Sequence, residues 1–357
     1  MQPLEDAICG YPIVAAGGGA EEVAELVERL RPTGRLLVVS DSNVGPLYAK
    51  PLADELRSSG REVREFTVEA GESSKCIAVM ERLWNEAFAG PIDRDDAVVA
   101  VGGGVVGDLG GFLASTLMRG IPVVQVPTSV LAMSDAAIGG KTGINLSAGK
   151  NLVGAFHRPC GVIQWIGALP TLSEREHRSG LAEVVKSAMI EGEDAFAALE
   201  RGAGSLVAGD PGVTQRGVMM AAHLKARVVH EDEHEGGLRR LLNLGHTFGH
   251  ALERSSGYGE WTHGECVAVG MVIVCRYGES IGFTDSAVTS RLVSLLESLK
   301  LPVSTRSLRV DEWLDPMLRD KKRSGDAIRL ILCRKPGVCE TVKTPITEIA
   351  EWVRTQC

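Results

Sequence analysis

The first half of the chain alternates short, β-branched apolar runs with segments whose apolar residues recur at helical spacing. Three runs are typical of buried strands: RLLVVSDSN (Arg35 to Asn43), DAVVAVGGG (Asp96 to Gly104) and PVVQVPTS (Pro122 to Ser129). Helical spacing marks EEVAELVERL (Glu21 to Leu30) and KCIAVMERLWNEAFA (Lys75 to Ala89). Since strands that alternate with helices form βαβ units, we predict an α/β domain with a mostly parallel sheet over residues 1–172.

The pattern changes after about Leu172, where nearly every apolar segment has helical spacing. Examples are SGLAEVVKSAMI, VMMAAHLKARVVHEDE, CVAVGMVIVCRYGESIG and SRLVSLLESLK. One late pair of strands, IRLILCR and CETVKTP, is joined by a Pro-Gly turn at Lys335 to Val338. We therefore predict a mainly α-helical domain over residues 173–357, with the active site in the cleft between the two domains.

The charge distribution argues against nucleic-acid and membrane partners. Charged residues make up 24% of the chain, the net charge is -8, and no block of lysine and arginine stands out. The start, MQPLEDAICGYPIV, lacks a signal-peptide pattern, and no run approaches the roughly 18 apolar residues of a membrane span. The 8 cysteines are scattered singly, so we expect reduced thiols in a cytoplasmic protein.

A glycine-rich segment, VAVGGGVVGDLGGF, connects a predicted strand to a predicted helix. Its order, GGGxxGD, differs from the GxGxxG of ordinary dinucleotide-binding turns, so a structural turn and a dinucleotide site both stay open. The nearby GESSK (Gly71 to Lys75) adds a carboxylate and an ammonium, which favours the second interpretation. Asp41 and Asn43, at the end of the first clear strand, could bind ribose hydroxyls.

The segment from Pro127 to Asn151 is expected to be a polar loop. It carries Asp135, Lys141, Lys150 and Asn151 among glycine, alanine and serine, where a solvated helix face is not expected. Lysine and asparagine donors that converge in this way suit a phosphate group, and Arg119 could join them.

The segment NLGHTFGHALE carries two histidines, His246 and His250, four residues apart. Side chains at this spacing share one helix face, so both could hold a single metal ion. The alternative is that the two imidazoles have separate functions.

Several segments together extend over nearly the whole chain. They are GESSK, GGGVVGDLGGF, RGIPVVQVPTSVLAMSDAAIGGKTGIN, GKNLVGAFHRP, SGLAEVVK, HEDEHEGGLRRLLNLGHTFGHALE, THGE, and DKK near Asp320. Through them the chain resembles 3-dehydroquinate synthase, the sugar-phosphate cyclase of the shikimate pathway. The resemblance implies a carbon–oxygen lyase that converts 3-deoxy-D-arabino-heptulosonate 7-phosphate into 3-dehydroquinate and phosphate, by transient oxidation with NAD, phosphate elimination, reduction and aldol closure.

The resemblance also implies a metal- and substrate-binding role for the helical domain. Its metal ligands, for Zn²⁺ or Co²⁺, are Glu183, His246 and His263. Substrate hydroxyls and the oxidised carbon are assigned to Asp135, Lys186, Lys225 and Asn243, and the substrate carboxylate to Arg239 with Lys225. The phosphate is assigned to Lys141, Asn151, His250 and Lys322 (or its neighbour Lys321), with Arg119 contributed by the second subunit of a homodimer.

Further positions are implied to contact NAD in the first domain. They are Asp41, Asn43, Glu72, Lys75, Gly103, Gly104, Val105, Asp108, Thr128, Ser129, Leu131, Asp135, Lys141, Lys150 and Asn151. The chain departs from the family where D-x-D often precedes L-x-TLP-x-RE, because Trp165, Gly167 and Leu169 stand there, followed by Thr171-Leu172-Ser173. This departure affects the expected nucleotide contacts and none of the catalytic positions.

Three other interpretations compete with this one. A metal-dependent polyol dehydrogenase would not need the phosphate and carboxylate groups Lys141, Lys322 and Arg239. Cyclases that make a deoxyinosose or a valiolone act on substrates without a carboxylate, whereas Arg239 and Asn243 favour a carboxylated one; an aminated heptulosonate would use the same clamp. A catalytically dead binding protein should have lost a metal or base residue, and Glu183 and His263 are present.

Overall fold

The computed structural model describes residues 9–31, 33–233, 236–256, 260–305, 309–322 and 327–356. The chain forms two compact units. The first comprises Met1–Leu172 together with Lys225–His230, and the second comprises Ser173–Leu224 and Glu231–Cys357. Among the described residues, no helix is long and apolar enough to cross a membrane.

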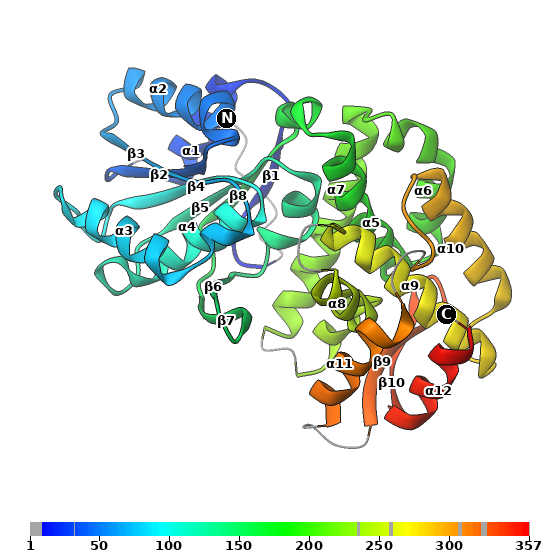
Figure 1. The fold of residues 1–357 in the computed structure, drawn as a ribbon. Coiled ribbons are helices and arrows are strands. Elements are labelled where there is room, and N and C mark those ends of the chain that lie inside the picture. Colours follow the sequence, from blue (N-terminus) through cyan, green and yellow to red (C-terminus); the bar gives the residue numbers. More distant parts are fainter. Residues whose placement is uncertain are drawn as a thin grey trace. The chain divides into compact units, whose positions relative to one another are not determined.

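A six-stranded parallel sheet forms the centre of the first unit (Figure 1), which confirms the predicted α/β domain. Its strand order is β1-β8-β5-β4-β2-β3. The strands are β1 (Ile13–Ala16), β2 (Leu36–Asp41), β3 (Val63–Val68), β4 (Ala97–Gly102), β5 (Val123–Pro127) and β8 (Gly161–Trp165). Strands β2, β4 and β5 are buried throughout, as expected for a parallel sheet covered on both faces.

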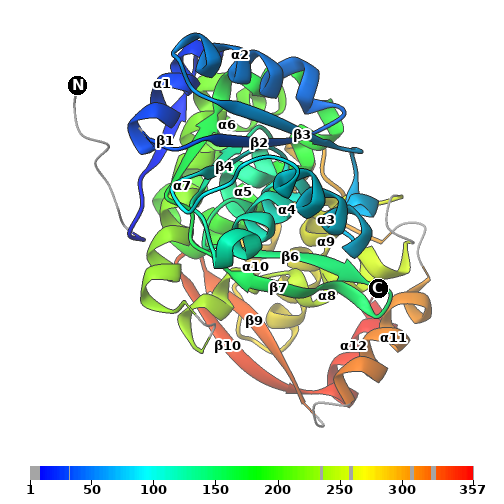
Figure 2. The same cartoon turned by 90° about the vertical axis from the view of Figure 1, so that its left-hand side faces the viewer.

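Helices cover both faces of this sheet (Figure 2). One face packs on α1 (Ala20–Leu30) and α2 (Lys50–Ser58), and the other on α3 (Ile77–Phe88) and α4 (Gly104–Thr116). The alternation of side chains along β2 divides them between the two cores: Leu36 and Val38 point to one, Leu37 and Val39 to the other.

The polar segment expected to be a loop is largely structured, so that prediction was wrong. It contains a short helical turn, η4 (Ala132–Ala136), and a hairpin of β6 (Lys141–Leu146) and β7 (Gly149–Phe156). Gly143 and Gly154 face each other across this hairpin, and a Cβ on Gly154 would lie 1.9 Å from the carbonyl oxygen of Thr142. Glycine has low strand propensity, which is why the sequence resembles a loop although the close backbone approach requires glycine.

The second unit is mainly helical, as predicted, and contains one two-stranded antiparallel sheet. Besides one short 3₁₀ turn, η6 (Leu238–Asn243), the described helices are α5 (Glu174–Glu191), α6 (Glu193–Val207), α7 (Pro211–Glu231), α8 (His246–Ser255), α9 (His263–Ser280), α10 (Ser286–Ser298), α11 (Val310–Lys322) and α12 (Ile346–Gln356). The sheet pairs β9 (Ala327–Lys335) with β10 (Val338–Pro345), which confirms the predicted strand pair. Residues Lys225–His230 of α7 belong to the first unit.

Candidate active site

Glycines allow α5, α8 and α9 to approach closely in the second unit. Gly264, in the first turn of α9, lies against α5: a Cβ there would be 1.8 Å from the carbonyl oxygen of Ser179. Gly270 lies against the residue before α8, since a Cβ there would be 2.0 Å from the carbonyl oxygen of Gly245. Gly245 itself has φ 78°, a left-handed conformation that favours glycine. The three helices therefore meet backbone to backbone where Glu183, His246 and His263 project.

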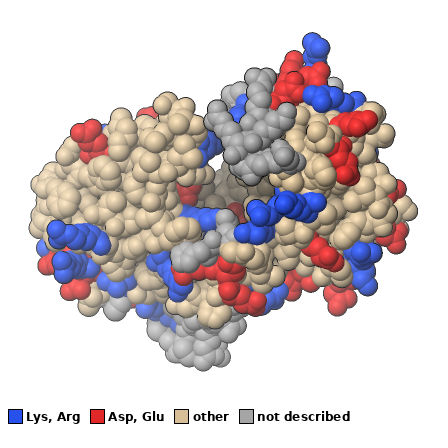
Figure 3. Space-filling view, turned by 90° about the horizontal axis from the view of Figure 1, so that it is seen from below, with Lys and Arg blue, Asp and Glu red and all other residues tan. Residues whose placement is uncertain are grey.

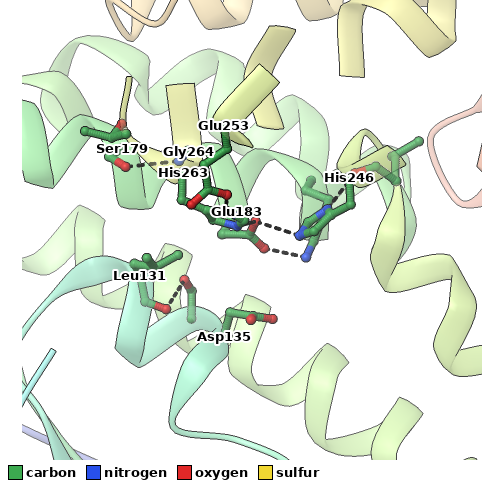
Figure 4. Close-up of polar contacts among 12 residues, drawn as sticks. Leu131, Asp135, Ser179, Glu183, His246, Glu253, His263 and Gly264 are labelled. Carbon is green, nitrogen blue, oxygen red and sulfur yellow. Dashed lines mark hydrogen bonds and ion pairs between the residues drawn. The ribbon is translucent and has the colours of Figure 1, made fainter. Parts of the chain in front are cut away.

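Glu183, His246 and His263 lie together, each offering a ligand atom within 4.8 Å of the others. Figure 4 shows the Glu183 carboxylate between the two imidazoles. Nε2 of His246 lies 3.5 Å and Nε2 of His263 lies 3.6 Å from Oε1 of Glu183. Both N···O distances are longer than in an ordinary hydrogen bond, which is the spacing expected of ligand atoms arranged around a single ion position.

The carboxylate of Glu183 fits a metal because it is buried and not hydrogen-bonded. Its side chain is 1% exposed, and neither oxygen accepts a hydrogen bond of normal geometry among the described residues. The ammonium of Lys186, one turn later on α5, forms an ion pair with Oε2. Burial alone would raise the pKa of Glu183, but Lys186 and then the neighbouring histidines hold it well below its ordinary value. An ionised, buried carboxylate with unused lone pairs suits a divalent cation.

Each imidazole has an oxygen acceptor at Nδ1, which orients its Nε2 toward Glu183. Nδ1 of His246 lies 3.2 Å from the carbonyl oxygen of Leu244, and Nδ1 of His263 lies 3.1 Å from Oε2 of Glu253. When Nδ1–H donates to these oxygens, Nε2 is left as the ligand atom facing Glu183. Glu253 was not among the predicted site residues, because its only signal in the sequence is its place seven residues after His246.

The neighbouring charges shift the pKa values of the two imidazoles in opposite directions. Burial disfavours the charged form of His263, but the adjacent carboxylates of Glu183 and Glu253 outweigh this and raise its pKa to about 10. Burial, with the charge of Lys186, lowers the pKa of His246 to about 3. Ligation of a metal would need both imidazoles in the neutral form.

His250 lies beside this cluster rather than in it. Its ring centroid is 5.2 Å from that of His246 and 5.9 Å from that of His263. A second set of possible ligands, His250 with Glu253 and His263, also has its atoms within 4.8 Å of one another. In that set Oε2 of Glu253 already pairs with Nδ1 of His263. The oxygens of Glu183, by contrast, accept no hydrogen bond among the described residues.

A polar cavity of about 310 Å³ adjoins the cluster within the second unit. Asn243, His246 and His250 line it, so the structure brings these three predicted residues together. The predicted clamp Arg239 is 2% exposed and donates from Nη1 to the carbonyl oxygen of Glu233. Lys322 ends α11, and its side chain, like that of Lys321, lies outside the described part of the chain.

In the first unit, five of the predicted cofactor residues form one polar network. The buried ammonium of Lys75 donates to Asp108 Oδ2 at 2.6 Å and to Asn151 Oδ1 at 2.5 Å. Oε1 of Glu72 lies 3.8 Å from Nζ of Lys75 and 3.9 Å from Nζ of Lys150. Burial raises the pKa of Asp108 despite the adjacent Lys75.

The predicted glycine turn lies next to this network. Gly103 is the N-cap of α4 and has no side chain to cap it, and a Cβ on Gly104 would lie 3.3 Å from Cβ of Ala136. Thr128 donates its N–H to the carbonyl oxygen of Gly102, and Ser129 Oγ accepts from the N–H of Ala132. The remaining predicted residues of this turn, Val105 and Leu131, flank the same strand ends.

Four predicted residues of the first unit form pairs with one another. Lys225 reaches Asp135: Nζ lies 2.6 Å from the carbonyl oxygen and 2.9 Å from Oδ1. Oδ1 of Asp41 accepts the N–H groups of Asn43 and Val44, so this carboxylate also holds the turn after β2. Lys141 begins β6 and is exposed.

The segment where the chain departs from the family is well packed. Trp165 is 2% exposed, donates from Nε1 to the carbonyl oxygen of Gly18, and meets Tyr48 edge to face at 5.0 Å. Ser173 caps α5 by accepting the N–H of Glu176. The unusual residues here therefore have structural functions.

Comparisons with known proteins agree with this geometry. Residues 65–179 match the family model described as "3-dehydroquinate synthase N-terminal", and residues 180–323 match "3-dehydroquinate synthase C-terminal". A 3-dehydroquinate synthase of Symbiobacterium thermophilum is 45% identical over 94% of this chain and 94% of its own length.

Two solved structures of related cyclases superpose on most of the chain. One is a 2-deoxy-scyllo-inosose synthase with carbaglucose-6-phosphate, NAD⁺ and Co²⁺ (26% identity, TM-score 0.86, 97% and 96% of the two chains covered). The other is 2-epi-5-epi-valiolone synthase of Streptomyces hygroscopicus with NAD⁺ and Zn²⁺ (29% identity, TM-score 0.86, 99% and 97% covered). The chain belongs to the 3-dehydroquinate synthase family.

Proposed function

We propose that the chain converts 3-deoxy-D-arabino-heptulosonate 7-phosphate into 3-dehydroquinate and phosphate, using NAD and one Zn²⁺ or Co²⁺ ion. The buried carboxylate of Glu183, which lacks hydrogen bonds and faces His246 and His263, carries this proposal. The family membership and the ions bound by the two solved cyclases support it.

The metal would be held by Glu183, His246 and His263, and the NAD by the polar network around Lys75 and Asp108 with the Gly103–Gly104 turn. When bound, the metal polarises substrate hydroxyls and the NAD accepts and returns a hydride, so there is no net redox change. Lys75 and Asp108 hold each other's charged groups in place where the NAD is proposed to bind. No side chain caps the first N–H groups of α4, so they can bind the phosphates of the NAD.

Contacts within the protein fix the positions of three side chains that we propose to bind the substrate. Lys186 is 1% exposed and paired with Glu183, so its amino group is fixed beside the proposed metal position. Lys225 is held by Asp135 and gives a second fixed ammonium. Arg239 is buried and donates to the carbonyl oxygen of Glu233, which helps to orient the guanidinium proposed to bind the substrate carboxylate.

The phosphate and its departure are the second half of the proposed reaction. We assign the phosphate to His250, Lys141, Asn151 and Lys322. Because the substrate's own phosphate can accept a proton as it leaves, the protein residues have only to position it and to balance its charge. The predicted location of this site between the two domains stays a prediction.

We also propose a homodimer in which Arg119 reaches the phosphate of the second subunit. Arg119 is exposed, and its side chain has no hydrogen bond or ion pair among the described residues. It follows Met118 in a segment with φ 50° and 67°, which is costly for residues other than glycine. Sedimentation tests the dimer, and mixing Arg119→Ala with a His246→Ala chain tests sharing, because hybrid dimers would regain activity.

The function is tested by measuring phosphate release and NADH together. We expect release of phosphate from the heptulosonate phosphate without accumulation of NADH. A chelator should abolish the activity, and addition of Zn²⁺ or Co²⁺ should restore it. A polyol dehydrogenase would instead accumulate NADH and release no phosphate. Comparison with the aminated heptulosonate phosphate decides between the two carboxylated substrates.

A further inference from the structure

The β6–β7 hairpin of the first unit is irregular at the residues proposed to contact NAD and phosphate. Between two regularly paired positions, β6 has one residue, Asn145, where β7 has three, Lys150 to Leu152. A bulge of this kind redirects the side chains that it carries, and such bulges are common beside active sites. Lys150 and Asn151, which both have predicted roles in the site, lie in this bulge.

Asn145 makes three hydrogen bonds, and each of them reaches a residue that was predicted to contact NAD. Its backbone N–H donates to the carbonyl oxygen of Lys75 at 2.8 Å. Its side-chain Nδ2 donates to Oε1 of Glu72, in the short turn η2 (Glu72–Ser74), at 2.7 Å. Its Oδ1 accepts the N–H of Asn151 at 2.9 Å. Asn145 therefore joins the segment before α3 to the bulge of the hairpin.

The bond to Asn151 supports a backbone conformation that residues other than glycine seldom adopt. Asn151 has φ 54°, in the left-handed region. In this conformation its Oδ1 accepts a hydrogen bond from Nζ of Lys75 at 2.5 Å. The acceptor that Asn145 provides for the N–H of Asn151 thus helps to hold the Asn151 side chain against Lys75.

The side-chain amide of Asn145 matches both of its partners. Nδ2 faces a carboxylate, which accepts hydrogen bonds, and Oδ1 faces a backbone N–H, which donates one. An aspartate at this position would keep the acceptor for Asn151 but would place a second carboxylate beside Glu72. An alanine would remove both contacts. The two ends of the amide therefore have separate functions that substitutions can distinguish.

The ammonium at the centre of this network is shielded from water. Lys75 is 4% exposed. By contrast, basic and acidic side chains are interspersed over the surface seen in Figure 3, where water weakens ion pairs. Hydrogen bonds to charged groups are stronger than those between neutral groups, and a low local dielectric strengthens them further. Removal of the Asn145 amide should therefore displace Glu72 and Asn151 measurably.

We propose that Asn145 is a positioning residue for the cofactor- and phosphate-binding residues of the first unit. It holds Glu72 in place for the NAD, and Asn151 for the NAD and the substrate phosphate, without itself being assigned to either ligand. The inference rests on the proposed function. It adds to that function a residue to which neither the sequence patterns nor the resemblance gave a role.

The test compares Asn145→Ala with Thr142→Val in the full chain, loaded with metal and freed of NAD. Oγ1 of Thr142 donates to the carbonyl oxygen of Ala155 at 2.9 Å, so the control also removes a side-chain hydrogen bond from the hairpin but leaves the network intact. Calorimetric titration should show NAD binding at least about tenfold weaker in Asn145→Ala and changed by less than about twofold in Thr142→Val. At saturating NAD, the KM for the heptulosonate phosphate should rise about tenfold in Asn145→Ala, with a smaller change in kcat.

A double-mutant cycle tests the contact with Glu72 directly. Asn145→Asp should weaken NAD binding at least about tenfold in the wild-type background, because two carboxylates then face each other. In the Glu72→Gln background the same substitution should weaken it by less than about threefold, because the new amide can donate to the new carboxylate. Any loss of affinity that Glu72→Gln causes by itself cancels in this comparison.

Equal NAD affinity in Asn145→Ala and Thr142→Val would overturn the proposal, and so would equal effects of Asn145→Asp in the two backgrounds. A wild type that binds NAD but releases no phosphate from the heptulosonate phosphate would refute the proposed substrate, while the NAD titrations would still decide the role of Asn145. A wild type that binds no NAD would refute the proposed cofactor and this inference with it.

Discussion

The polar clusters of the two units are built on opposite principles. In the first unit Lys75 lies between Asp108 and Asn151, and each charge has a partner in the protein itself. In the second unit the carboxylate of Glu183 is 1% exposed, and only Oε2 has a charged partner, Lys186. Its Oε1 faces Nε2 of His246 and Nε2 of His263 without a hydrogen bond. A network whose polar atoms are paired is stable without a ligand, whereas a buried carboxylate oxygen without a hydrogen bond is stabilised by one. The comparison indicates that the second unit is the one organised around a cation.

The largest expected effect is that of removing a ligand from the unsatisfied cluster. His246→Ala should lose the metal and lower kcat/KM by at least about a thousandfold, because several kcal/mol of charge stabilisation disappear. Metal analysis of the purified variant and phosphate release measure the two losses. A variant that kept its metal and its activity would show that His246 is not a ligand.

Removing the support of a ligand should cost less than removing the ligand. Glu253 orients His263 through Nδ1, and loss of such a partner typically lowers metal affinity about 10- to 100-fold. We therefore expect Glu253→Ala to bind Zn²⁺ that much more weakly, with Glu253→Gln, which can still accept a hydrogen bond, in between. Competition with a chromophoric chelator measures both; unchanged affinity in Glu253→Ala would contradict the role.

A substitution in the Lys75–Asp108 network of the first unit should change the stability of the protein and leave its metal content unchanged. Lys75→Met leaves Asp108 without its partner, so we expect a loss of about 1–3 kcal/mol in the free energy of unfolding, measured without NAD. Lys50, whose ion pair with Asp54 is exposed, is the control, and Lys50→Met should change stability by less than about 0.5 kcal/mol. Equal effects would mean that burial does not distinguish the two pairs.

The smallest effect tests the division of work on α8. His250→Ala should keep the metal and raise the KM for the heptulosonate phosphate about tenfold, the loss of one charge-assisted hydrogen bond. The measurement is metal content together with steady-state phosphate release. A normal KM would remove His250 from the phosphate site.

Strands and helices with strong patterns could be predicted from the sequence. The resemblance also indicated that Glu183, His246 and His263 belong together, and the structure places them side by side. Their role as metal ligands stays a prediction. Two kinds of feature could not be predicted. The β6–β7 hairpin is held by the close approach of Gly143 to Gly154, and glycines weaken the strand pattern. The cavity beside the metal cluster is lined by residues of α8, β9 and β10, among them His250, Ile331 and Thr341, and only the packing of the second unit brings them together. Long-range packing of this kind leaves no local pattern.

The most direct test is calorimetric titration of the metal-free chain with Zn²⁺. Wild type and His250→Ala should each bind one ion per chain with similar affinity, and His246→Ala should bind it far more weakly. The opposite result, with binding kept in His246→Ala and lost in His250→Ala, would assign the ion to His250, Glu253 and His263 and contradict the role given to Glu183.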